Sequence, residues 1–257
     1  MEGLISITNR PWEICPQITQ INIEKHQQMV MYNITLIGTR HREDDFCTSN
    51  ELYKIFEVIS PDVIFEEMPP SYFDKYYVTK VRKNLESDAV LKYLENHNIQ
   101  HIPVDSDDIP SDAFFKDLEY MYNRIEKLTE INGFNYRKFS DMSSMYIRKY
   151  GLLYANSDDS ITIQNKIQDS MEKGLQVIND EKLYQTYQKW LKINEKRENE
   201  MLQNIYNYSK ENTFSNAIFM IGFAHRKSIM QKITEFEDKS EIKINWTFAQ
   251  PEWLKSL

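Results

Sequence analysis

The stretch NITLIGTRH, residues 33–41, decides the fold of this chain. Its mainly aliphatic and β-branched first half indicates a buried strand, and Gly38 ends that strand. Ser49 or Asn50 can then cap a helix that continues to about Ile59. We therefore expect a strand whose carboxyl end turns through Gly38 into a loop and then into a helix.

A second strand is expected at residues 62–66, since this short apolar run lies between Pro61 and Pro69. Together with the first strand and the helix between them it forms a β-α-β unit. The further expected elements are a helix from Ser87 or Asp88, a strand at 101–104, a strand at 217–221, a helix at 226–236 and an edge or late strand at 241–248. This alternation predicts an α/β fold with a mostly parallel or mixed central sheet flanked by helices.

Between these two groups of strands, residues 112–210 show no strand signal. Apolar positions recur there at helical spacing within stretches rich in Glu, Lys, Asn, Gln and Tyr. Breaks at Gly133, Gly151 and Gly174 predict four or so helices, and the last of them, from about Asp180 to Ser209, would be about 45 Å long. We expect one domain over residues 1–257 that contains this helical insertion, whose last helix could cover the ligand face of the sheet.

Composition excludes several classes of protein. A formal net charge of -8 disfavours nucleic acid as a ligand. No apolar run approaches the length of a membrane span, and Met1 to Arg10 lack the pattern of a secretory signal, so the expected location is the cytoplasm. Cys15 and Cys47 fit a reducing compartment and do not form a disulfide framework.

Two histidines occur in the same context, because Gly38-Thr39-Arg40-His41 and Gly222-Phe223-Ala224-His225 each follow an apolar strand directly. Each histidine should therefore lie at the carboxyl end of a strand, which is where ligands bind in open α/β sheets. The chain contains only five histidines, so the repetition favours a shared site over two unrelated packing residues.

Carboxylates follow the other predicted strands at the same edge. Glu66 and Glu67 end the second strand, and because successive strand residues point to opposite faces, only one of them should face the site. We favour Glu67 and keep Glu66 open. Asp105 follows the third strand and could bind a metal, orient a histidine or make only a turn.

Several of these segments resemble the TraB/TIKI family, within the wider erythromycin esterase and ChaN-like group. Residues 36–41 resemble its opening Gly-Thr-x-His motif, and residues 60–68 resemble its Pro-Asp-x-Val strand that ends in glutamate, where Glu67 takes the functional position. Residues 194–201 resemble its Glu-Arg-Asn/Asp helix motif with Arg197, and residues 218–225 its second Gly-x-x-His motif. The resemblance covers about half of the chain and leaves much of the insertion unmatched.

The resemblance implies hydrolysis, with metal-dependent proteases, lactone hydrolases and haem-binding proteins among the group. His41, Glu67 and His225 are the donor types expected of a divalent cation such as Mn, Co or Zn with a position open for water. Arg197 would then stabilise an oxyanion or a substrate carboxylate, and Glu66 or Asp105 would accept the proton of water. The expected function is hydrolysis of a peptide or small-molecule ester.

Two other functions remain open. The chain could bind haem or another small ligand without catalysis, or its long polar helices could present a surface to a protein partner. A metal-free form, in which the same histidines and glutamate act directly on water, also remains open.

Overall fold

The computed structural model describes residues 32–132 and 135–255. The predicted helix break at Gly133, the thiol of Cys15 and the sequence-based interpretation of Met1 to Arg10 lie outside these ranges. The other cysteine, Cys47, is buried with a free thiol.

Five strands form one sheet in the order β3-β2-β4-β1-β5, and every neighbouring pair in it is parallel. The strands are β1 (Tyr32–Thr39), β2 (Val63–Glu66), β3 (Gln100–Pro103), β4 (Asn216–Gly222) and β5 (Ile244–Phe248). The predicted α/β class is thus confirmed, and the last strand lies at an edge as expected. β4 returns from the far side of the helical insertion to lie between β1 and β2, which makes it the central strand.

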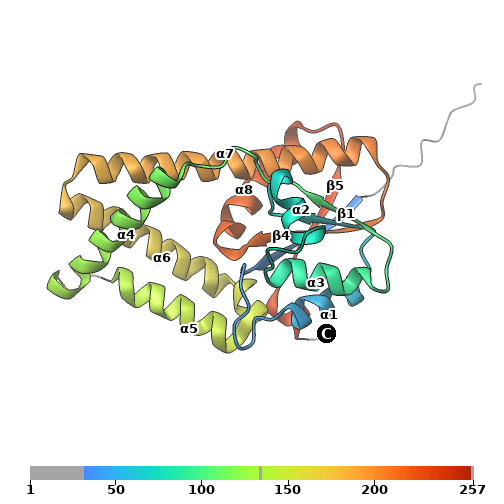
Figure 1. The fold of residues 1–257 in the computed structure, drawn as a ribbon, viewed down its shortest axis with the longest axis horizontal. Helices are drawn as coiled ribbons and strands as arrows, with labels where there is room; N and C mark the ends of the chain where they lie inside the picture. Colours follow the sequence, from blue (N-terminus) through green and yellow to red (C-terminus); the bar gives the residue numbers. More distant parts are fainter. Residues whose placement is uncertain (1–31, 133–134, 256–257) are drawn as a thin grey trace, which may run out of the picture.

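Helices cover both faces of the sheet (Figure 1). Helices α1 (Ser49–Ile59) and α3 (Leu85–Leu94) pack on one face, whereas α7 (Glu181–Glu211) and α8 (Arg226–Lys239) pack on the other. Three short elements, α2 (Phe73–Tyr77) and the 3-10 turns η1 (Pro70–Tyr72) and η2 (Phe223–His225), follow β2 and β4, and α9 (Pro251–Leu254) follows β5.

The strands bury side chains on both faces, which explains their continuous apolar runs. In β1, Leu36 belongs to the core under α7 and α8, and the next residue, Ile37, belongs to the core under α1 and α3. In β4, Phe219 and Met220 divide between the two cores in the same way. The period-two alternation of a strand therefore builds two cores from one sheet.

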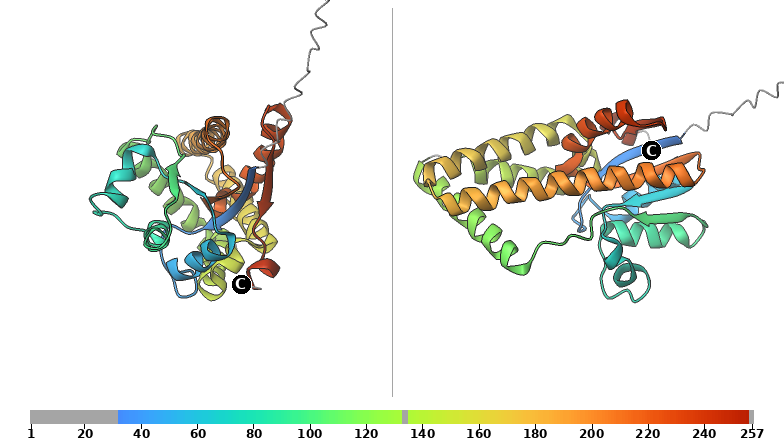
Figure 2. Two further views of the ribbon diagram at one scale, coloured as in Figure 1. Left: turned by 90° about the vertical axis from the view of Figure 1, so that its right-hand side faces the viewer. Right: turned by 90° about the horizontal axis from the view of Figure 1, so that it is seen from above.

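The insertion consists of α4 (Asp112–Asn132), α5 (Tyr136–Ala155), α6 (Asp158–Ile178) and α7. This confirms the expected four helices. Figure 2 shows that α7 runs from the far end of the insertion along the sheet, and its 31 residues correspond to about 46 Å. A third core of apolar residues from α4, α6 and α7 holds the insertion together.

Two glycines predicted to break helices behave differently. Gly151 has φ +54° and interrupts α5, and a Cβ atom there would lie 1.9 Å from the carbonyl oxygen of Phe46, so only glycine fits. The prediction for Gly174 was wrong, because it lies buried inside α6. Ser157 and Asn179 cap that helix at its two ends, and one internal glycine costs only about 1 kcal/mol.

No helix within residues 32–132 and 135–255 is long and apolar enough to cross a membrane. The cytoplasmic location remains a prediction from the sequence.

The carboxyl end of β1 is held by the side chain of Asn156. Strand β5 pairs with β1 only as far as Leu36. Beyond that point the Asn156 amide accepts a hydrogen bond from the Gly38 N–H at 2.8 Å and donates one to the Gly38 carbonyl at 2.9 Å. Asn156 thus takes the place of a neighbouring strand at the turn that leads to His41.

We expect Asn156→Ala to lower the free energy of unfolding by about 2–4 kcal/mol, because two buried backbone groups of Gly38 lose their partners. Urea denaturation followed by circular dichroism measures this loss. Asn207→Ala is the matched control, since Asn207 is exposed on α7 and its side chain accepts a hydrogen bond from Gln203 four residues earlier. It should change stability by less than about 0.5 kcal/mol. A loss below about 1 kcal/mol for Asn156→Ala would contradict this role.

Candidate active site

The site lies where β1, β2 and β4 end side by side. Their register pairs Thr39 with Gly222 and Glu66 with Met220. His41, Glu67 and His225 each follow within three residues of a strand end, so the parallel pairing brings all three to one edge of the sheet. The convergence expected from the two Gly-x-x-His segments is therefore what the structure shows.

Glu67 lies at the centre of this cluster and is almost fully buried, with 5% of its side chain exposed. Its Oε1 accepts a hydrogen bond from Arg197 Nη2 at 2.8 Å, and its Oε2 accepts one from the Gly222 N–H at 2.6 Å. The Nε2 atoms of His225 and His41 lie 3.7 and 3.9 Å from its two oxygens. Burial alone would raise the pKa of Glu67, but the charges of His225, His41 and Arg197 and the Gly222 amide lower it, so the carboxylate stays ionised.

Each histidine has a carboxylate of its own behind it. His41 Nδ1 lies 3.2 Å from Glu86 Oε1, and His225 Nδ1 lies 2.7 Å from Glu198 Oε1. Both rings are thereby oriented with Nδ1 outward and Nε2 toward Glu67. This is the arrangement in which a second carboxylate fixes the tautomer and direction of a histidine ligand.

These carboxylates also change the histidine pKa values. The hydrogen bond to Glu86, opposed by burial and aided by the charges of Glu86 and Glu67, raises the pKa of His41 to about 9. For His225, burial acts to lower the pKa, but Glu198 and Glu67 outweigh it and raise the pKa overall. Without a bound cation, His41 therefore carries a proton at neutral pH.

Arg197 reaches the site from the middle of α7. Besides Glu67 it contacts Asp105, with Nη2 at 2.6 Å from Oδ2 and Nε at 3.1 and 3.3 Å from the two oxygens. Burial opposes the charge of Arg197, but Asp105 and Glu67 raise its pKa above the ordinary value. Asp105, which is 3% exposed, therefore holds the guanidinium against Glu67.

Glu66 lies next to this cluster and borders a small void with His41 and Glu67, but its carboxylate has other partners. Its carboxylate accepts hydrogen bonds from the hydroxyl of Tyr77 and from His101 Nδ1, the latter at 2.9 Å. Adjacent residues at the end of β2 thus reach different partners, as the alternation of a strand requires. Of the two glutamates left open by the sequence, Glu67 is the one that lies beside His41 and His225.

Glycine at position 222 leaves room for the side chains of the site. A Cβ atom there would lie 3.3 Å from both His41 Nε2 and Glu67 Oε2, which is tighter than ordinary contact. The missing side chain lets the Gly222 amide approach the carboxylate while the imidazoles remain close.

Sequence reasoning missed Glu86 and Glu198. Glu86 lies in the first turn of α3, where an acidic residue is expected for its interaction with the helix dipole alone. Glu198 directly follows Arg197 in the sequence, and this neighbouring position was the available signal for it. Two hydroxyls fix these carboxylates in turn, with Thr39 donating to Glu86 at 2.6 Å and Ser228 to Glu198 at 2.5 Å.

Among the residues that the structure describes, no group of three or more His, Cys, Asp or Glu side chains is already arranged as a metal site. The donors that could hold a cation are the two Nε2 atoms and the Glu67 carboxylate. His41 is the most exposed of the three, with 55% of its side chain exposed, compared with 16% for His225.

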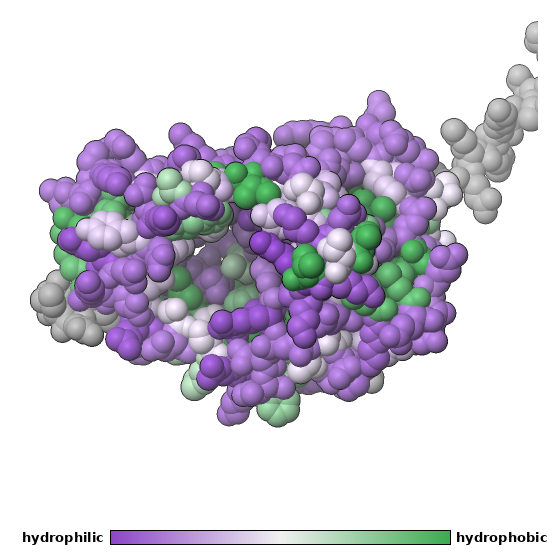
Figure 3. Space-filling view, viewed as in Figure 1, coloured by the Kyte–Doolittle hydropathy of each residue, from purple (hydrophilic) through white to green (hydrophobic). Residues whose placement is uncertain are grey.

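A cavity of about 440 Å³ opens beside the cluster, and His41, Glu67, Asp105 and Arg197 line one part of it. Its other walls come from η1 and α2, from the loop before α4, and from α4 and α7. In Figure 3 this face of the molecule has a hollow near its middle, between the insertion helices and the sheet. The volume is in the range of small-molecule sites.

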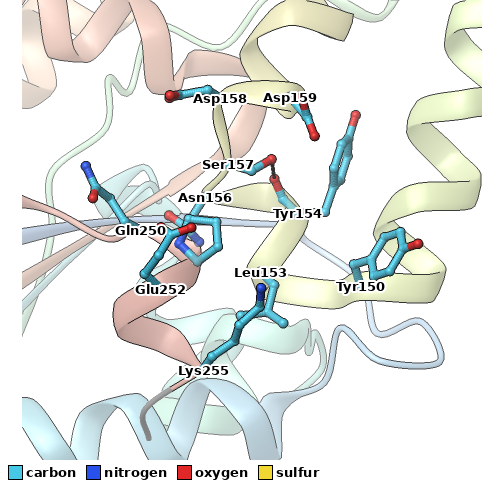
Figure 4. A pocket seen from close by; sticks show the side chains of 11 residues that line it. Tyr150, Leu153, Tyr154, Asn156, Ser157, Asp158, Asp159, Gln250, Glu252 and Lys255 are labelled. Carbon is cyan, nitrogen blue, oxygen red and sulfur yellow. Dashed lines mark hydrogen bonds between the residues drawn. The ribbon is translucent and has the colours of Figure 1, made fainter.

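A second groove, shown in Figure 4, lies between the end of α5, the start of α6 and α9. Tyr150, Tyr154, Asp158, Asp159 and Glu252 are among the side chains that line it. Its described lining contains no histidine or cysteine. His41 and Glu67 instead line the 440 Å³ cavity, and His225 and Glu198 line a larger cavity of about 710 Å³ that is bordered by α4, α6, α7 and α8.

Comparison with known proteins adds no family to this description: no protein-family model, no curated protein and no solved structure matches the chain.

We expect Glu86→Gln to return the His41 pKa from about 9 toward its ordinary value, because the carboxylate hydrogen bond is the largest cause of the shift. The raised pKa of His41 stabilises the fold below pH 6.5, and this stabilisation is lost as the pH rises through about 9. The variant should lose this pH dependence. Because water screens the half-exposed ring, the stability effect should be small and the pKa itself is the better measurement.

NMR titration of the imidazole Cε1–Hε1 signals, with His41 assigned from His41→Gln, measures this shift. Glu198→Gln is the matched control, since it should lower the pKa of His225 and leave that of His41 nearly unchanged. An unchanged His41 pKa in Glu86→Gln would show that the Glu86 carboxylate does not hold the imidazole.

Proposed function

We propose that this chain is a hydrolase of peptide or ester bonds, in which His41, Glu67 and His225 hold a divalent cation such as Mn, Co or Zn. One observation carries the proposal: both Nδ1 atoms are anchored by carboxylates, and both Nε2 atoms are directed at the same buried glutamate. The resemblance of the two Gly-x-x-His segments to the TraB/TIKI family supports the same chemistry.

The spacing of the donors fits a cation better than direct hydrogen bonds. The Nε2 to oxygen distances of 3.9 Å for His41 and 3.7 Å for His225 are too long for hydrogen bonds to Glu67. Neighbouring ligand atoms around a tetrahedral zinc ion are roughly 3.4 Å apart. The two histidine-to-glutamate spacings are thus slightly wider than the spacing of neighbouring ligands in a closed site.

A bound cation would lower the pKa of a water molecule and polarise the scissile carbonyl. The chain's own residues supply the rest. Glu67 remains ionised at neutral pH, as both cation binding and proton acceptance require. Arg197 is charged, lines the cavity beside Glu67, and would stabilise the negative oxygen that develops on the substrate.

Hydrogen bonds hold all three acids that could accept the proton of the attacking water, and those of Glu67 come from Arg197 and the Gly222 amide. Both oxygens of Asp105 are engaged by Arg197, which makes Asp105 a positioning residue. Glu66 is engaged by Tyr77 and His101. Glu67 is the carboxylate nearest to both Nε2 atoms.

Haem binding is less favoured by this geometry. An axial histidine needs a free ring nitrogen facing an apolar slot, whereas both Nε2 atoms here face a charged carboxylate. A Soret band on addition of haem would support that alternative.

We expect His41→Ala, His225→Ala and Glu67→Gln each to lower hydrolysis of a panel of peptides and esters by at least about 100-fold with little loss of fold. Each change should also lower the bound metal measured by elemental analysis after incubation with Mn, Co or Zn. The reason is that each removes one of the three proposed donors.

His97→Ala is the matched control, because His97 lies on the surface, pairs with Glu57 and stacks on Tyr93 outside the cluster. It should leave activity and metal content unchanged. Full activity in all three site variants would end the hydrolase proposal. Full activity of a metal-free wild-type protein would show that the proposed hydrolysis does not need a cation.

A further inference from the structure

We infer that the substrate is a small amide or ester that carries a compact apolar group, aromatic or branched aliphatic, and a negative charge at a distance from the scissile bond. This inference rests on the proposed hydrolase function and adds the substrate class. It is drawn from the parts of the 440 Å³ cavity that the cluster around Glu67 does not occupy.

The cavity wall opposite the cluster is apolar and aromatic. Phe115 comes from α4, Trp190 and Ile193 come from α7, and Ile109 comes from the loop before α4. Phe115 and Ile109 remain 43% and 40% exposed although they line a cavity. Apolar side chains left in contact with water in this way gain stability when a ligand covers them.

Size limits what this wall can cover. A volume of about 440 Å³ accommodates one small molecule and is near the lower end of the range for ligand pockets. A single aromatic or branched aliphatic group beside the scissile bond fits it, whereas several residues of an extended peptide would not.

Three cations lie in or next to the Tyr72 side of the cavity, in a chain of net charge -8. Lys83 lines the cavity, and Tyr72, another lining residue, has the Lys75 ammonium 4.2 Å and the Arg82 guanidinium 4.9 Å from its ring centre. Within the described part of the chain, none of these three cations forms an ion pair at 4 Å or less.

The remaining charges around the cavity are already balanced. The charge of Lys83 helps to lower the pKa of Glu43, but the two groups do not form an ion pair within the described part of the chain. Asp108 is paired with Lys196 at 2.6 Å, and Asp105 is paired with Arg197. Lys83 is therefore the lining cation whose charge remains open to a substrate anion.

The test compares N-benzoylglycine, its neutral amide N-benzoylglycinamide, and N-acetylglycine, together with the corresponding benzoyl and acetyl esters of glycolate. Affinity is measured by calorimetry on His225→Ala, which removes the proposed chemistry but leaves the cavity walls in place. Turnover of the same compounds is measured on the wild-type protein.

We expect the benzoyl compounds to bind at least about tenfold more tightly than the acetyl compounds, as burial of an aromatic ring predicts. Trp190→Ala and Phe115→Ala should reduce this preference to less than about threefold. Phe115→Ala keeps the test valid if Trp190→Ala does not fold, because Phe115 is exposed. Tyr184→Ala, an exposed aromatic of α7 outside the cavity lining, is the matched control and should retain the full preference.

Lys83→Gln should weaken the binding of N-benzoylglycine by about three- to fivefold, as loss of an exposed ion pair predicts. It should leave the binding of N-benzoylglycinamide unchanged. Lys127→Gln, an exposed lysine of α4 away from the cavity, should change neither.

The inference is overturned by equal affinity for benzoyl and acetyl compounds, by a preference that survives both wall variants, or by no binding at all. The expected binding pattern without turnover would contradict the hydrolase function and leave the cavity assignment standing. Turnover without the preference for benzoyl compounds would contradict the cavity assignment and leave the hydrolase function standing.

Discussion

The burial of the Glu67 carboxylate is the constraint on which the rest of the site depends. A carboxylate that is 5% exposed at the end of a strand is stable only if its charge is matched and its oxygens are bonded. Arg197 and the Gly222 amide supply the bonds, and His41 and His225 supply further positive charge. Arg197 and the two histidines each contact a further carboxylate on the side away from Glu67. Negative and positive groups therefore alternate outward from the centre of the cluster.

Helix α7 connects the stability of the fold to this cluster. Its later part, including Met201 and Ile205, packs in the core on one face of the sheet, while its earlier part, including Leu183, packs in the core of the insertion. Arg197 and Glu198 lie between these two packed parts. The position of both charged groups is therefore set by apolar contacts on either side of them, and rigid packing gives the site its geometry.

The sequence predicted the main strands and helices and the site residues that follow strand ends. It did not predict which strands pair or which helix residues face the site. Strand ends follow from local patterns, so His41, Glu67 and His225 could be placed at one edge in advance. The position of β4 between β1 and β2 could not, because it depends on pairing across the whole insertion. Glu198 was missed for a similar reason: consecutive helix residues point about 100° apart, and the sequence does not say how α7 is rotated against the sheet.

The sheet and the helical insertion position different parts of the site, because strands are held in register by hydrogen bonds and the insertion helices are joined by loops. Hydrogen bonds along β1, β2 and β4 hold the carboxyl edge in register, so groups that need sub-ångström placement belong there. The cavity wall made by Phe115 and Trp190 needs only shape and apolar character, and helices joined by loops can supply both. Phe115 on α4 and Trp190 on α7 line the cavity and are not among the described hydrogen-bond partners of Glu67. In the proposed function, their replacement would therefore change the preferred substrate and leave the histidines and carboxylates in place. In the proposed function, specificity and chemistry would thus be carried by separate parts of one chain, and Arg197 lies on the helix where the two parts meet.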